Sequence, residues 1–172
     1  MSQLFRVQNT ALSVDEALAA VGGDDVGGVA VFIGTVRDHN EGRAVTLLEY
    51  QAYESMAERQ MKKIAEGIAH EVPGVRLAAL HRVGALAVGD RAVVCVAASA
   101  HRGEAFRACR LLIDRIKADV PIWKREHGPD GPYWVGWQDA RCHGHEHAHD
   151  HVHSGHAEQL VHAGANRPPR HG

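Results

Sequence analysis

The chain has 172 residues, of which 45% are hydrophobic and 23% charged, and its formal net charge at pH 7 is -2. These values predict one ordinary globular domain and exclude the strongly basic surface typical of nucleic-acid-binding proteins. Because no apolar run is long enough to span a membrane and the first residues do not form a signal peptide, we expect a cytoplasmic protein with neither a membrane nor a nucleic acid as partner.

The first third of the chain predicts three strands and a short helix. Residues 3–8 favour a strand, and Ser13 opens a capping box that begins a helix. The apolar, β-branched run 28–37 predicts a buried strand that delivers Arg37 at its end. A further strand is predicted over residues 45–53, and we expect it to pair antiparallel with the strand 28–37.

The middle of the chain alternates helical and strand patterns. A helix is predicted over residues 54–70, because apolar side chains recur on one face, at Ala57, Met61, Ile64, Ala65 and Ile68. Strands follow at 75–83 and 91–98, joined by a turn at Gly89. Cys95 in the second of these strands, and Cys109 beyond it, are expected to be small core residues rather than parts of a disulfide framework.

Hairpins and crossovers are mixed in this order of elements, which favours an α+β fold with a mixed sheet over a doubly wound parallel sheet. We expect the globular domain to occupy residues 1–140. Nine of the fourteen histidines lie in the last thirty residues, and large apolar side chains are scarce there. Residues 141–172 are therefore predicted to be a disordered, histidine-rich tail.

The stretch DRIKADVPIWKRE, residues 114–126, carries the first candidate site. It contains the end of an amphipathic helix, a break at Pro121, and a strand that returns past the helix end. This path is predicted to bring Lys117 and Lys124 together, where like charge and partial burial favour a basic or nucleophilic amine. The alternative is two unrelated surface lysines, with Asp114 pairing to Lys117 one helical turn away.

A second group of residues suggests an anion site. Ser99, Ala100, His101 and Arg102 lie where a strand passes into a helix, and Arg37 and His39 follow another strand end. If the sheet brings these strand and helix ends together, six basic side chains would surround an anionic ligand, and Glu126 would be their counter-charge. The six are Arg37, His101, Arg102, Lys117, Lys124 and Arg125. The alternative is ordinary solvated connections.

The tail offers metal ligands, whereas the globular part has no recognisable metal-ligand spacing, P-loop or nucleotide-binding glycine motif. Six histidines alternate with small or acidic residues: His143, His145, His147, His149, His151 and His153. Imidazoles at this density bind nickel, zinc or copper, with Cys142, Glu146 and Asp150 as potential co-ligands. The alternative is a low-complexity extension with incidental metal affinity.

Three segments, VFIGTVRDHN, ASAHRGEAF and above all IKADVPIWKRE followed by Trp-Val, resemble the large subunit of molybdopterin synthase, the MoaE family. The resemblance runs from about residue 4 to residue 137. It implies an α/β hammerhead fold and a homodimer flanked by two small β-grasp subunits, a heterotetramer overall. It also implies transfer of two sulfurs from the thiocarboxylated Gly-Gly end of the small subunit to cyclic pyranopterin monophosphate, with no cofactor required.

The resemblance also implies roles for individual residues. The family's essential lysine beside the inserted tail corresponds to Lys117, and its second functional lysine to Lys124. The implied substrate contacts are Thr35, Val36, Arg37, His101, Arg102, Lys117, Lys124, Arg125 and Glu126. The family can supply an arginine from the partner protomer shortly after the Trp-Val pair, whereas this chain has Gln138 there, with Arg141 nearby.

A different class of function remains open at this point. The domain would then only dock a β-grasp partner, and the tail would store metal. Sulfur transfer to a pterin precursor separates the two hypotheses, because a docking module binds the partner and makes no dithiolene.

Overall fold

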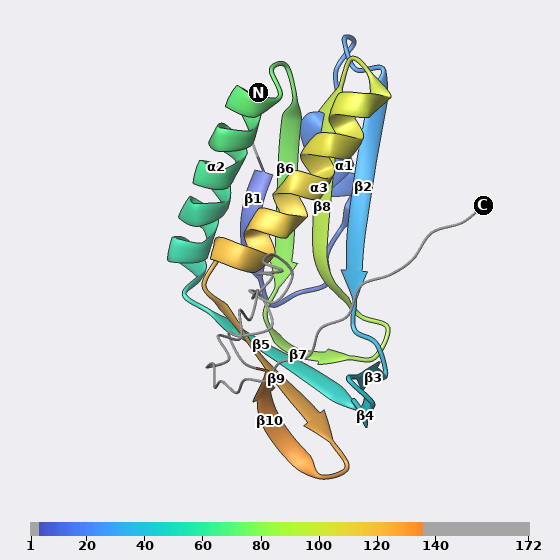
Figure 1. Cartoon of the computed structure of the whole chain (residues 1–172), viewed down its shortest axis with the longest axis vertical. Helices are drawn as coiled ribbons and strands as arrows, with labels where there is room; N and C mark the ends of the chain where they lie inside the picture. The colour runs from blue at the N-terminus through green and yellow to red at the C-terminus, as the bar shows by residue number, and fades with distance from the viewer. Residues whose placement is uncertain (1–3, 136–172) are drawn as a thin grey trace, which may run out of the picture.

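The computed structural model describes residues 4–135, which form three helices and ten strands in two four-stranded sheets and a small hairpin (Figure 1). In chain order the elements are β1 (Leu4–Gln8), α1 (Val14–Val21), β2 (Gly28–Thr35), β3 (His39–Asn40), β4 (Arg43–Ala44), β5 (Leu47–Ala52), α2 (Glu54–Glu71), β6 (Arg76–Arg82), β7 (Gly84–Ala87), β8 (Arg91–Ser99), α3 (Arg102–Asp119), β9 (Ile122–Gly128) and β10 (Gly131–Val135).

The first sheet has the strand order β1-β6-β8-β2 and is mixed. β1 runs parallel to β6, whereas β6 and β2 each pair antiparallel with β8. Helices α2 and α3 cover one face of this sheet, and α1 packs against β6 and β8 from the other (Figure 1). The predicted α+β class with a mixed sheet is therefore confirmed.

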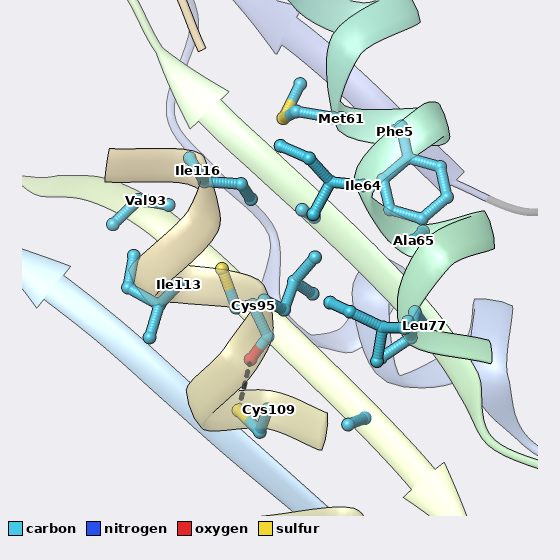
Figure 2. Close-up of a cluster of buried hydrophobic side chains, with 14 of the residues drawn as sticks. Phe5, Met61, Ile64, Ala65, Leu77, Val93, Cys95, Cys109, Ile113 and Ile116 are labelled. Atoms are coloured by element: carbon cyan, nitrogen blue, oxygen red, sulfur yellow. Dashed lines mark hydrogen bonds between the residues drawn. The ribbon is translucent and has the colours of Figure 1, made fainter. Parts of the chain in front are cut away.

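Both faces of β6 and β8 are buried, because helices cover the sheet on each side. Alternate side chains of these strands join two separate clusters. Cys95 packs with α2 and α3, and Val94 packs with α1. Figure 2 shows the larger cluster, in which the Cys109 thiol of α3 donates a hydrogen bond to the Cys95 carbonyl at 3.6 Å. Both cysteines are buried core residues, as predicted.

The helices begin and pack as their patterns indicate. The Ser13 hydroxyl accepts a hydrogen bond from the Glu16 backbone N–H at 3.1 Å, which caps α1. On α2, the five apolar residues of the predicted face are the five buried ones. None of the helices between residues 4 and 135 is long and apolar enough to cross a membrane.

The prediction of a buried strand at residues 28–37 is wrong for one of its faces. β2 lies at the edge of the sheet, and α1 does not extend over it. Val29, Val31 and Ile33 are consequently 45%, 42% and 40% exposed. We call these three side chains the β2 stripe.

The expected pairing of this strand with the next one is also wrong. β2 pairs with β8, whereas β5 belongs to a second sheet with the order β10-β9-β5-β7. The chain leaves β6 for this sheet through Gly84, whose φ of 85° favours glycine. The sequence predicted neither β7 nor the hairpin of β3 and β4, because each is too short to show a period. The second sheet lies at the C-terminal end of α3 (Figure 1).

Candidate active site

Lys117 and Lys124 lie on either side of the break between α3 and β9. Val120 ends the helix in an extended conformation (φ -83°, ψ 128°), as expected for a residue before proline. β9 then runs back along β5, where Lys124 is directly opposite Tyr50. Both lysines line the same two neighbouring cavities, so the prediction that this path brings them to one site is confirmed.

The two cavities differ in their walls. The first, of about 380 Å³, is formed by the end of α3, the start of β9 and the side chains of His81 and Val135. The second, of about 290 Å³, is formed by the end of β2 and the loop after it. Four residues line both cavities: Tyr50, Val93, Lys117 and Lys124. We refer to these four residues as the common wall.

Lys117 projects from the last turn of α3 and is exposed, in contrast to the predicted partial burial. Its Nζ lies 6.0 Å from the centre of the Phe32 ring, a distance at which an ammonium group is still attracted to an aromatic face. Asp114 does not pair with it, since Asp114 contacts Arg110 at 3.5 Å instead. The ammonium of Lys117 is thus left to face the cavities.

Lys124 has a buried anionic partner. Its Nζ lies 2.7 Å from Oε1 of Glu126, whose side chain is only 3% exposed. Burial favours the neutral carboxyl, but hydrogen bonds from Lys124 and Tyr133 outweigh it, so the pKa of Glu126 is lowered. Glu126 therefore remains ionised at neutral pH, and the prediction that it acts as a counter-charge is confirmed.

A chain of hydrogen bonds connects Arg37 to this pair. The Arg37 guanidinium donates to Oδ1 of Asn40 at 2.9 Å, and Nδ2 of Asn40 donates to both oxygens of Glu126 at 3.1 Å. Thr35, Val36, Arg37 and His39 all line the second cavity, as predicted. The sequence did not indicate Asn40, which acts through its neighbours.

Arg125 lies on the opposite face of β9, because successive side chains of a strand alternate. Its Nε donates to Oε2 of Glu49 at 3.1 Å, and its guanidinium lies 5.3 Å from the centre of the Trp134 ring. The hydrogen bond from Arg125 lowers the pKa of Glu49 to about 2. Arg125 lines neither cavity, so its predicted place in the anion site is wrong for this chain alone.

His101 and Arg102 are also apart from the lysines. They begin α3, and fifteen residues of helix separate Arg102 from Lys117, or about 22 Å at 1.5 Å per residue. Arg102 lies against the start of β2, where a Cβ on Gly28 would come within 3.1 Å of its Cα. Arg37 follows the other end of that strand. The six predicted cations therefore do not surround one point within a single chain.

Comparisons with known proteins place the chain in a family. The family model described as "MoaE protein" matches residues 7–119, about two thirds of the chain. This chain belongs to the MoaE family. Molybdopterin synthase catalytic subunit 1 of Mycobacterium tuberculosis is 48% identical over 131 residues, which cover 76% of this chain and 89% of that protein.

Solved structures agree with the MoaE fold. Molybdopterin synthase from Staphylococcus aureus superposes with a TM-score of 0.75 at 35% identity, covering 79% of this chain and 99% of that one. A protein–protein complex of subunits 1 and 2 of molybdopterin-converting factor from Helicobacter pylori has a TM-score of 0.60 at 22% identity, covering 76% and 88%. At that identity the second match shows the fold only.

Among the residues of this MoaE chain that line the cavities without having been predicted are two with polar aromatic rings. Tyr50 belongs to the common wall, and His81 lines the first cavity from β6. Both lie within apolar strand patterns, and the only signal of a binding role in the sequence is the polar atom that each side chain carries. The rings meet edge to face, with centroids 5.0 Å apart.

The predicted metal ligands of this MoaE chain fall outside the described residues. Within residues 4–135, His, Cys, Asp and Glu form no group of three or more able to hold a metal ion. The six tail histidines lie beyond this range, as do Gln138 and Arg141. Metal binding by the tail thus stays a prediction.

Proposed function

We propose that this chain is the catalytic subunit of a molybdopterin synthase, which transfers sulfur from a thiocarboxylated carrier protein to cyclic pyranopterin monophosphate. One observation carries the proposal: two lysines from different elements lie in the common wall between two cavities. A sulfur donor and a sulfur acceptor need separate binding places with a shared boundary, and both substrates are anionic. The names of the family's relatives support the same reaction.

The first cavity suits the C-terminal tail of a small β-grasp subunit. Its wall is mostly apolar, from Ile113, Ile116 and Val120 to Ile122, and the ammonium groups lie at the boundary with the second cavity. A Gly-Gly tail has no side chains, so it fits a narrow space and places its terminal charge beside Lys117.

The second cavity suits the pterin substrate. Arg37 and His39 line the side away from the first cavity, and there they would bind the cyclic phosphate. Thr35 and Val36 complete this side, while Glu126 holds Lys124 in place through their 2.7 Å contact. The substrate carbons that accept sulfur would then face the common wall.

The two lysines divide the chemical work. Lys117, which has no anionic partner among the described residues, would contact the terminal acyl group and move protons as general acid and base. Lys124, already oriented by Glu126, would stabilise negative charge on the departing oxygen or an intermediate. No resident metal or other cofactor is needed for these steps.

A homodimer would explain the location of His101 and Arg102. Since about 22 Å of helix separates Arg102 from Lys117, these two residues would complete the site of a second protomer rather than their own. The β2 stripe offers an apolar surface for that contact on a strand that forms a sheet edge within residues 4–135. Gln138 or Arg141 would replace the family's cross-dimer arginine. Two such chains with two small subunits would form a heterotetramer.

Mixed dimers test this shared site. In a dimer of one Lys117→Ala chain and one Arg102→Ala chain, a shared arrangement leaves one site with both residues intact, so about half of the wild-type activity returns. If each site is built within one chain, both sites remain defective. No recovery in the mixed dimer would contradict a shared site without affecting the proposed reaction.

Reconstitution tests the reaction itself. The full chain is mixed with thiocarboxylated small subunit and cyclic pyranopterin monophosphate, and dithiolene formation is measured. Small subunit ending in an ordinary carboxylate is the matched control, since it binds without donating sulfur. Complex formation without dithiolene would refute the proposal and favour the docking-module alternative. A cytoplasmic location remains a prediction.

A further inference from the structure

The common wall contains one polar residue besides the lysines. Val93 is apolar, so Tyr50 is the only other member able to hydrogen-bond to a ligand at the boundary of the two cavities. It reaches this place from β5, where it lies opposite Lys124 on β9 and Gly84 on β7. Under the proposed function, the group that must occupy this boundary is the terminal acyl group of the sulfur carrier.

The Tyr50 hydroxyl is free to bind such a ligand. No hydrogen bond connects it to another residue in the range 4–135, although half-buried tyrosines usually find a partner. Two side-chain polar atoms in this range are fully buried without a partner, namely Nε of Arg6 and Nε of Arg82. The Tyr50 hydroxyl oxygen is not one of them, so it is not fully buried. The hydroxyl therefore retains access to the space in the cavities.

The surroundings hold Tyr50 in place as a neutral donor. His81 packs its ring against the Tyr50 ring at 5.0 Å and 84°, and its Nδ1 lies 2.9 Å from the carbonyl oxygen of Arg82. Burial, with a smaller effect from the charge of Glu126, raises the pKa of Tyr50 to about 12. Burial lowers the pKa of His81 to about 4, so this ring adds no charge at neutral pH.

We infer that Tyr50 is a further catalytic residue, whose hydroxyl donates a hydrogen bond to the acyl oxygen of the thiocarboxylate bound in the first cavity. This role rests on the proposed function. A thiocarboxylate shares one negative charge between oxygen and sulfur, and oxygen is much the better hydrogen-bond acceptor. A donor on the oxygen side therefore turns the sulfur toward the second cavity. There a sulfur lone pair bonds to the pterin carbon as the carbon–oxygen bond of that carbon breaks, and the departing oxygen takes a proton from Lys117.

The same hydrogen bond assists release of the carrier. When water cleaves the acyl–sulfur link, the water oxygen bonds to the acyl carbon, and the C–S electron pair remains on sulfur. One water proton returns to the Lys117 amine, which gave up a proton in the preceding step, and the other passes to solvent. The tail ends as a carboxylate, and sulfur stays with the pterin. Negative charge grows on the acyl oxygen during this step, so a fixed neutral donor there stabilises the transition state.

Tyr50→Phe tests the inference. The substitution keeps the ring that contacts His81, and it removes a hydroxyl that has no partner among residues 4–135, so the fold should be retained. We expect the single-turnover rate of sulfur transfer at saturating substrates to fall about 10²-fold, as for loss of one oxyanion donor. Affinity for the small subunit and KM for the pterin should stay within about threefold.

Tyr53→Phe is the matched control. Tyr53 is 68% exposed, lines neither cavity and contacts the Trp123 ring edge to face, so loss of its hydroxyl should not change the rate. A Tyr50→Phe rate within about twofold of wild type, or a loss that lies wholly in KM, would overturn the role of Tyr50 alone. If the wild-type chain forms no dithiolene, the proposed function fails, and the role of Tyr50 fails with it.

Discussion

Replacing Glu126 by glutamine removes one charge from the interior and leaves the shape almost unchanged. In the wild-type chain this carboxylate accepts hydrogen bonds from Lys124, Asn40 and Tyr133. Glutamine offers one carbonyl oxygen to these three donors, and its NH₂ group cannot accept. The variant therefore loses the ion pair and at least one further hydrogen bond.

The size of the loss follows from the burial of the two partners. Removing one member of a fully buried ion pair costs about 3–5 kcal/mol, and a single charge-assisted hydrogen bond contributes about 1.5–3 kcal/mol. The side chain of Glu126 is 3% exposed, but that of Lys124 is 30% exposed and can turn toward water. We therefore expect Glu126→Gln to lower the free energy of unfolding by about 2 kcal/mol, a value within the range for a single charge-assisted hydrogen bond.

Urea unfolding of the two proteins across pH measures this loss. Because the folded-state pKa of Glu126 is lowered, its stabilisation is fully present above the unfolded-state pKa of glutamate, about 4.3. It is lost as the pH falls through the folded-state pKa, so the two unfolding curves should converge in acid. Glu66→Gln, on the exposed face of α2, should change stability by less than about 0.5 kcal/mol. A difference that persists unchanged in acid would refute the reasoning.

Three further results are expected. Lys117→Ala should slow sulfur transfer by about 10²–10⁴-fold with little change in small-subunit affinity, and Lys124→Ala should cause a smaller loss of rate. A Lys117→Ala rate within about twofold of wild type would exclude a catalytic role for Lys117. Val31→Lys adds a charge to the β2 stripe and should shift the protein to monomers in analytical ultracentrifugation, whereas an unchanged dimer would require a different interface. Truncation after Arg141 should abolish nickel or zinc binding in calorimetry while sparing turnover. Metal affinity of the full chain should fall below about pH 6, and equal binding by both forms would assign the ligands to the globular domain.

The helices were predictable because their information is local. A helical face and a helix cap depend only on neighbours in sequence. The structure buries the predicted face of α2, at Ala57, Met61 and Ile68, and caps α1 at Ser13 as expected. Strand partners depend on contacts between distant segments. The run at 28–37 has the composition of a central strand, yet its place at a sheet edge follows from β8, about sixty residues later.

The candidate site divides in the same way. The placement of Lys117 and Lys124 follows from one proline and a short reversal of the chain, so the sequence predicted it. The separation of His101 from Lys117 follows from the length of α3, which lies between them, and a pattern of basic residues alone does not indicate it. The place of Tyr50 in the site depends on the pairing of β5 with β9, and no residue nearby in sequence indicates it.

The alternation along β9 limits how this segment can change. Lys124 and Glu126 face the cavities, while Arg125 between them pairs with Glu49 on the reverse side. Loss of a single residue between Pro121 and Lys124 would exchange these faces, directing the Arg125 guanidinium toward the substrate and placing the Glu126 carboxylate opposite Glu49. The charge count would stay the same, but the Glu126 contact and the reactive amine would be lost together. The segment thus tolerates substitutions far better than changes of length.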